Sequence, residues 1–187
     1  MSGLLLLLML GGWVGLTALL VYRWRHEAQR TRGAKWRVHA FFIPLLLCWL
    51  AASFWYAGGR KIYYDAEVDR LCEIDGGVKV YERVTLPAAE YDRLVAQNWI
   101  LPDASEVKES DSYFKTRETR YFRESDPQVA KTVIRYIRRS DGKVVGEYIH
   151  YGRGGGDLPG PWHGSNHSCP NPAKTPGITR QLFSRGQ

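Results

Sequence analysis

Two long apolar runs without charged residues lie in the first third of the chain, at residues 4–22 and 38–57. As an α-helix, each run would be roughly 30 Å long, which matches the hydrocarbon core of a bilayer. Buried helices of soluble proteins rarely run this long without a polar side. We therefore predict a hairpin of two transmembrane helices, in which Pro44 kinks the second helix and the small residues Gly11 and Gly15 allow close packing.

A cleaved signal peptide is the alternative interpretation of the first run. Such a signal normally has basic residues before its apolar run and a small-residue cleavage site after it. The sequence has neither feature around residues 4–22. We therefore expect both apolar runs to be retained as membrane spans.

Two amphipathic helices are predicted after Gly58 and Gly59, which we expect to end the second span. The apolar spacing in residues 61–74 is helical and leads up to Asp75, Gly76 and Gly77, which turn the chain. Pro87 begins a short helix at 88–97. The residues expected to face inward are Tyr64, Val68, Leu71 and Cys72 in the first helix, and Tyr91, Leu94 and Val95 in the second.

Strand patterns fill most of the remaining domain. Apolar and polar residues alternate in 78–84, and the strands expected after it are 112–123, 129–139 and 143–151. Asp141 and Gly142 form a strong hairpin signal between the last two strands.

These elements predict an α+β domain over residues 58–187, in which an antiparallel sheet of about four strands packs against one or two helices. The strand at 112–123 is polar on both faces, so we expect it near a sheet edge. The tail from residue 152 to 187 is rich in Gly, Pro, Ser and Asn, which predicts a long loop with one helical turn near 178–183.

The distribution of charge predicts the orientation of the hairpin. The connector at residues 23–37 holds six basic residues and one acidic residue, whereas residues 58–187 hold 20 basic and 18 acidic residues. Short basic loops stay in the cytoplasm, so both termini and the domain should lie outside it, in the periplasm of a bacterium. The net charge of +7 is therefore mainly a topology signal, and we expect no nucleic-acid partner.

The three cysteines support the same compartment. Cys48 lies inside the second span, which leaves Cys72 and Cys169 as the candidate disulfide pair of the domain. Disulfides form in oxidising compartments such as the periplasm. Two unrelated buried thiols are the alternative.

The glycine-rich stretch at 152–167 is the main candidate for a binding site. A phosphate-binding loop would need a helix after the glycines, but prolines follow them here. A structural loop is one alternative. The other is a surface cleft for a peptide, glycan or small ligand, formed by Arg153, Asp157, Trp162 and His163.

The same stretch also contains the residue types of a metal site and of a hydrolase active site. His163, His167 and Cys169 have a metal-like spacing, but the intervening residues do not favour a helix, and an oxidised cysteine cannot bind as a thiolate. Ser165 and Asp157, with His150 or His163, would supply the residue types of a hydrolase, although no nucleophile elbow accompanies them. We assign no catalytic residue, metal or cofactor from the sequence.

Two stretches resemble uncharacterised bacterial membrane-associated proteins: Leu71–Cys72–Glu73–Ile74–Asp75–Gly76–Gly77–Val78–Lys79–Val80–Tyr81–Glu82, and the run from Tyr151 to Trp162. This resemblance implies a bacterial inner-membrane protein and carries no functional residue. Our leading hypothesis is an anchored interaction domain, with the lipid bilayer and another envelope protein as partners. The alternative is an anchored envelope hydrolase or small-ligand-binding protein that uses residues 152–167.

Overall fold

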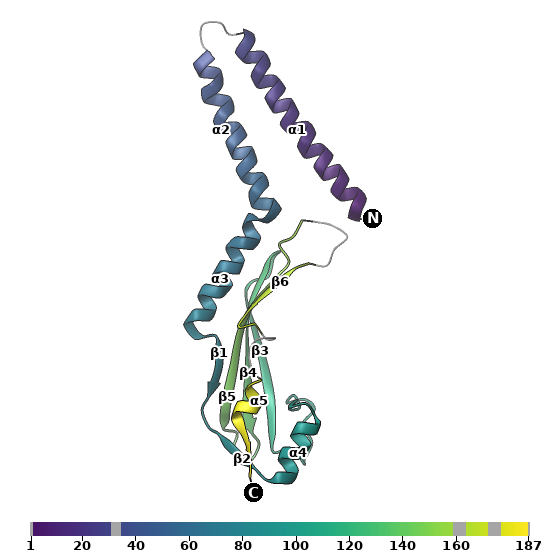
Figure 1. The fold of residues 1–187 in the computed structure, drawn as a ribbon, viewed down its shortest axis with the longest axis vertical. Coiled ribbons are helices and arrows are strands. Elements are labelled where there is room, and N and C mark those ends of the chain that lie inside the picture. Colours follow the sequence, from purple (N-terminus) through teal and green to yellow (C-terminus); the bar gives the residue numbers. More distant parts are fainter. Residues whose placement is uncertain (1, 31–34, 159–163, 172–176, 187) are drawn as a thin grey trace. The chain divides into compact units, whose positions relative to one another are not determined.

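The computed structural model describes residues 2–30, 35–158, 164–171 and 177–186, and it has an α+β fold (Figure 1). The chain divides into two compact units. The first consists of residues 1–62 with 156–165, and the second of residues 63–155 with 166–187.

The first unit is a helical hairpin of α1 (Ser2–Arg30) and α2 (Lys35–Phe54). Both helices are long and apolar enough to cross a membrane by length and composition, and their most apolar windows contain no buried residue. α1 continues eight residues beyond the predicted span to Arg30, because Arg, Glu, Ala and Gln favour a helix and residues 23–32 contain no glycine. The basic connector is therefore mostly helical.

Two reciprocal hydrogen bonds join the helices of the hairpin. Trp13 Nε1 donates to Ser53 Oγ at 2.7 Å, and Trp49 Nε1 donates to Thr17 Oγ1 at 3.0 Å. Each hydroxyl in turn donates to the carbonyl of the tryptophan four residues earlier in its own helix. The prediction that Gly11 and Gly15 pack between the helices is wrong, because a Cβ added at either position would meet no atom within 4 Å.

The helical backbone does not end at Gly58 and Gly59, contrary to our prediction. It continues through one π-helical turn, η1 (Trp55–Gly59), into α3 (Arg60–Asp75). Gly59 allows the ring of Phe54 to lie close to the backbone, since an added Cβ would lie only 3.0 Å from Phe54 Cε1. Gly59 therefore accommodates the π-helical turn, and the two glycines do not end the helix.

The second unit contains a five-stranded antiparallel sheet. Its strands are β1 (Gly77–Val80), β3 (Tyr113–Arg123), β4 (Gln128–Arg138), β5 (Val144–Gly154) and β6 (Asn166–Cys169), in the order β1-β5-β4-β3. β1 pairs with residues 146–149 of β5, and β6 pairs with residues 151–154 along the same edge. β3 lies at the opposite edge, as predicted.

A parallel pair of short strands, β2 (Val84–Leu86) and β7 (Phe183–Arg185), lies outside this sheet. The predicted strand at 78–84 is thus divided between β1 and β2, because the amides of Tyr81 and Glu82 both donate to the Val145 carbonyl and the chain leaves the sheet there. The tail predicted as loop also contains β6 and β7, and its α5 (Ile178–Leu182) confirms the predicted helical turn.

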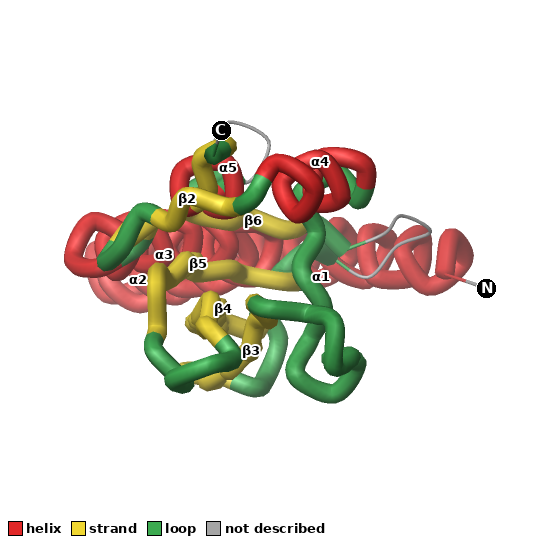
Figure 2. Tube along the Cα trace, turned by 90° about the horizontal axis from the view of Figure 1, so that it is seen from below, coloured by secondary structure: helices red, strands yellow, loops and turns green. Residues whose placement is uncertain are grey.

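Two apolar clusters form on opposite faces of the sheet. The residues of β4 alternate between them: Ile134 and Tyr136 face one cluster, while Val129 and Val133 face the other. α4 (Ala88–Ala96), α5 and β2 lie on the first face (Figure 2). The larger cluster, here called the α4/α5 cluster, consists of Leu86, Leu94, Leu101, Tyr113, Tyr136, Val145, Ile178, Leu182 and Phe183.

The smaller cluster lies under α3 and is called the α3 cluster. It consists of Val68, Cys72, Val129, Ile149 and Tyr151, with Tyr64 and Leu71 packed against it. The predicted inward face of this helix is therefore confirmed. In α4, Leu94 is buried as predicted, but Val95 is 43% exposed, so its inward assignment was wrong.

Candidate functional site

One face of α3 is connected to the sheet by a series of polar and covalent contacts. Asp65, Asp69, Cys72 and Asp75 recur at helical spacing and therefore share this face. The disulfide from Cys72 to Cys169 of β6, with Cα atoms 5.9 Å apart, confirms the predicted pair. The other three residues each meet a basic partner, as described next.

Asp75 at the end of α3 binds two residues of the sheet. It accepts a hydrogen bond of 2.6 Å from the Tyr151 hydroxyl and forms an ion pair with Lys131. These contacts, Lys131 first, lower the pKa of Asp75, and the Asp75 carboxylate raises the pKa of Lys131. Burial raises the pKa of Tyr151. The group is therefore a fixed ion pair that joins the helix end to β4 and β5.

Arg153, a predicted binding residue, lies inside the second unit. Its side chain is among the largest that are fully buried, and its Nε donates to Asp65 Oδ1 at 2.5 Å. Its Nη1 donates to the Gly155 carbonyl. A buried guanidinium that joins α3 to β5 is not available to line a surface cleft.

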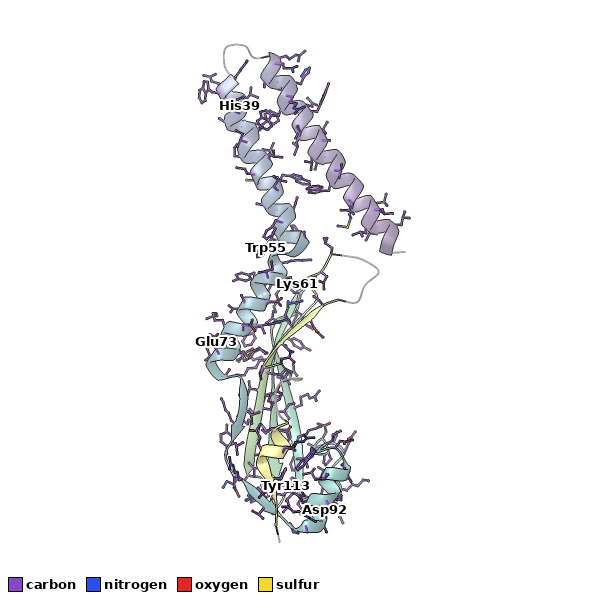
Figure 3. All side chains as sticks on the ribbon, viewed as in Figure 1. His39, Trp55, Lys61, Glu73, Asp92 and Tyr113 are labelled. Atoms are coloured by element: carbon purple, nitrogen blue, oxygen red, sulfur yellow. A yellow bond between two sulfur atoms is a disulfide. The ribbon has the colours of Figure 1, made fainter. Side chains whose placement is uncertain are left out.

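Asp157, the second predicted binding residue, belongs to the first unit. It forms an ion pair of 3.0 Å with Lys61, which Figure 3 labels, and accepts bonds from the backbone amide and hydroxyl of Ser165. The Ser165 amide is the main cause that lowers the pKa of Asp157 to about 2. The other two predicted residues, Trp162 and His163, lie outside the described residues.

The described residues form neither the hydrolase site nor the metal site considered for this stretch. Ser165 Oγ donates directly to Asp157, whereas a hydrolase triad places an imidazole between the two. Cys169 is oxidised, so it cannot act as a thiolate ligand beside His167. In the part of the chain that is described, no three His, Cys, Asp or Glu side chains are grouped to hold a metal ion.

The structure reveals a polar pocket that sequence reasoning missed. It has a volume of about 520 Å³ and is lined by Asp69, Asn166, His167, Ser168, Cys169 and Asn171. His167 Nε2 lies 2.8 Å from Asp69 Oδ1, and a carboxylate that orients an imidazole is a common arrangement in acid–base sites. One sequence pattern could have indicated this pocket. Asp69 and Cys72 are three residues apart in a helix and so share a face, and the disulfide of Cys72 brings that face next to β6.

The second candidate surface is the outer edge of β3. Residues 117–122 of this strand are all exposed, including the large side chains Tyr121 at 48% and Phe122 at 51%. β3 is eleven residues long and is covered by segment 102–104 only near Lys115, whereas the opposite edge is divided between the four-residue strands β1 and β6. Unpaired strand edges are natural sites for pairing with another chain.

No protein-family model matches the chain, and neither does any curated protein or solved structure in the comparisons. The predicted resemblance to bacterial membrane-associated proteins therefore stays a prediction.

Proposed function

We propose that this chain is a bacterial inner-membrane protein that presents a small interaction domain to other envelope components in the periplasm. The Cys72–Cys169 disulfide carries this proposal, because structural disulfides persist in oxidising compartments and are rare in the cytosol. Both apolar helices precede the bonded domain in the sequence. The basic residues between the spans favour a cytoplasmic connector, which leaves the domain on the periplasmic side.

The contacts of the charged residues in the domain support a role in protein interaction. Asp65 and Asp75 on the inner face of α3 are engaged in internal ion pairs, and Asp157 is bonded to Lys61 and Ser165. The exposed edge of β3 instead presents backbone groups and aromatic side chains to solvent. A scaffold with such an edge is suited to contact another protein.

A membrane-anchored envelope hydrolase or small-ligand-binding protein is the second candidate. The pocket at Asp69 and His167 favours it, because His167 ends the predicted 152–167 site and is held by a carboxylate. Asp69→Ala and His167→Ala should abolish the cellular function under this alternative while the disulfide still forms. An interaction domain should tolerate both substitutions.

Reporter fusions test the placement directly. Alkaline phosphatase fused after Gln187 should be active in a bacterial host, and the same enzyme fused within the basic connector should be inactive. On non-reducing gels, the full chain should migrate as a compact band that dithiothreitol removes. An inactive C-terminal fusion combined with free thiols at Cys72 and Cys169 would exclude a periplasmic domain.

A further inference from the structure

We propose that the free edge of β3 binds an acidic, extended segment of a partner protein, which adds as a further strand beside it. This inference rests on the proposed function, because it names the surface and the partner class of the interaction domain. Strand addition takes its affinity from backbone hydrogen bonds and its specificity from the side chains that flank them.

The direction of the backbone groups in β3 can be read from Lys115. Its amide donates to the Pro102 carbonyl and its carbonyl accepts from the Ala104 amide, both on the side away from β4. Backbone groups alternate in direction along a strand, so Arg117, Thr119 and Tyr121 also direct their amides and carbonyls outward. Within the described residues, none of these three has a backbone partner on that side.

The segment 102–104 covers only the first part of this edge. Beyond it, the outward groups from Arg117 to Tyr121 extend over about 13 Å at roughly 3.3 Å per residue, before the bulge between Tyr121 and Arg123. At the opposite edge of the sheet, the described strands β1 and β6 are shorter, with four residues each. β3 therefore offers the longest template for a partner strand.

Charge determines the kind of segment that fits. Lys115 and Glu118 already form ion pairs, with Asp103 and Arg135. Arg117 and Arg120 are exposed, and no carboxylate pairs with either one among the described residues. They lie on opposite faces of the strand, so a paired segment that carries Asp or Glu at positions three apart would neutralise both.

A peptide-binding measurement tests this proposal with the full chain in detergent. The probe is a synthetic ten-residue peptide of alternating Thr and Val, labelled with a fluorophore, with Glu at two positions three apart. A matched peptide carries Lys at the same two positions. We expect the acidic peptide to bind more tightly than the basic one by at least about tenfold, with an affinity that falls as salt rises.

Two variants of Thr119 separate backbone pairing from side-chain contact. Thr119→Pro removes the outward amide without removing a hydrogen bond to β4, and proline is tolerated at edge strands. Thr119→Val is the matched control, because it also lacks the hydroxyl that bonds Thr132 but keeps the amide. We expect loss of binding by Thr119→Pro and unchanged binding by Thr119→Val.

A charge reversal provides a second test that leaves the backbone intact. Arg117→Glu combined with Arg120→Glu should reverse the preference toward the basic peptide, while Arg70→Glu on α3 should leave it unchanged. Equal binding of both peptides, or full binding by a folded Thr119→Pro chain, would overturn the proposal. Self-association that Thr119→Pro abolishes would also overturn it, because a second copy would then occupy the edge. These measurements need no membrane orientation, so they can fail or succeed independently of the reporter fusions.

Discussion

The two faces of the five-stranded sheet are held together by different interactions. The α4/α5 cluster buries nine apolar residues, against five in the α3 cluster. On the α3 side, a disulfide, ion pairs at Asp65 and Asp75, and the contact between Asp69 and His167 supplement the smaller apolar contact. One face therefore depends mainly on the hydrophobic effect, and the other on covalent and electrostatic links.

The links of α3 to the sheet come from three strands. α3 follows the second apolar helix in the chain through η1. Its disulfide to β6 and its ion pairs with Arg153 of β5 and Lys131 of β4 fix one arrangement of the helix with the sheet. The α3 face should consequently respond to redox state, and the α4/α5 face should not.

Removal of the disulfide should have the largest effect on the α3 face. The bridge closes a loop of 97 residues, and loops near this length contribute about 4–5 kcal/mol in the chain-entropy description. Cys72→Ser, Cys169→Ser and the double variant should lose similar amounts of unfolding free energy, measured by urea denaturation of the full chain in detergent. Cys48→Ser is the control, since Cys48 is a free thiol in α2.

Hydrogen exchange should locate this loss. In the cysteine variants, amides of α3 and β6 should exchange faster, while those of α4 and α5 keep their protection. Equal loss of protection on both faces would mean that the sheet and its two clusters unfold as one unit. The two faces would then not differ in the interactions that stabilise them.

Leu182→Ala should have the next largest effect, and it acts on the opposite face. Leu182 is fully buried in the α4/α5 cluster and packs closely over Gly146, where an added Cβ would lie 2.7 Å from its Cδ2. Truncation of such a side chain costs about 3 kcal/mol. The same denaturation measurement should show this loss under both oxidising and reducing conditions. Val95→Ala on α4 is the matched control, because Val95 is exposed.

Sequence patterns predicted the elements that build both faces. The spacing of Val68 and Cys72 identified the inward side of α3, and the location of Cys48 in an apolar run left one possible disulfide pair. Alternation and the signal at Asp141 and Gly142 predicted the central hairpin of β4 and β5. These features depend on local patterns, which a single sequence contains.

The long-range polar contacts of α3 could not be predicted in the same way. Asp65 meets a residue 88 positions away and Asp69 one 98 positions away, so no local pattern connects the partners. Arg153 was assigned to a surface loop because the predicted strand ended at residue 151. In the structure, β5 continues to Gly154, and the alternation that buries Tyr151 also buries Arg153.

The Asp75 ion pair should make a moderate contribution that depends on pH. The pKa of Asp75 is lowered in the folded chain, so its contribution is present above the ordinary carboxyl pKa and is lost as the pH falls through the lowered value. Asp75→Asn should cost about 1–2 kcal/mol at neutral pH and remove this part of the acid sensitivity. Urea denaturation at pH 7 and below pH 4 measures both effects; an unchanged acid dependence would assign it to other carboxylates.

The contact between Asp69 and His167 should contribute least to stability. A loss of cellular function in variants of this pair would therefore indicate a functional role for the pocket and could not be explained by unfolding. Both side chains are about a third or more exposed, and solvent screens such pairs, so Asp69→Asn should change the unfolding free energy by less than about 0.5 kcal/mol. Glu67→Gln, which breaks the exposed pair with Arg70 on the same helix, is the matched control. If Asp69→Asn abolishes the cellular function while Glu67→Gln does not, the pocket is a functional site and the anchored hydrolase or ligand-binding alternative gains over the interaction domain. If both variants behave like the parent chain, the pair is only one of several links between α3 and the sheet, and the β3 edge remains the surface through which the domain acts.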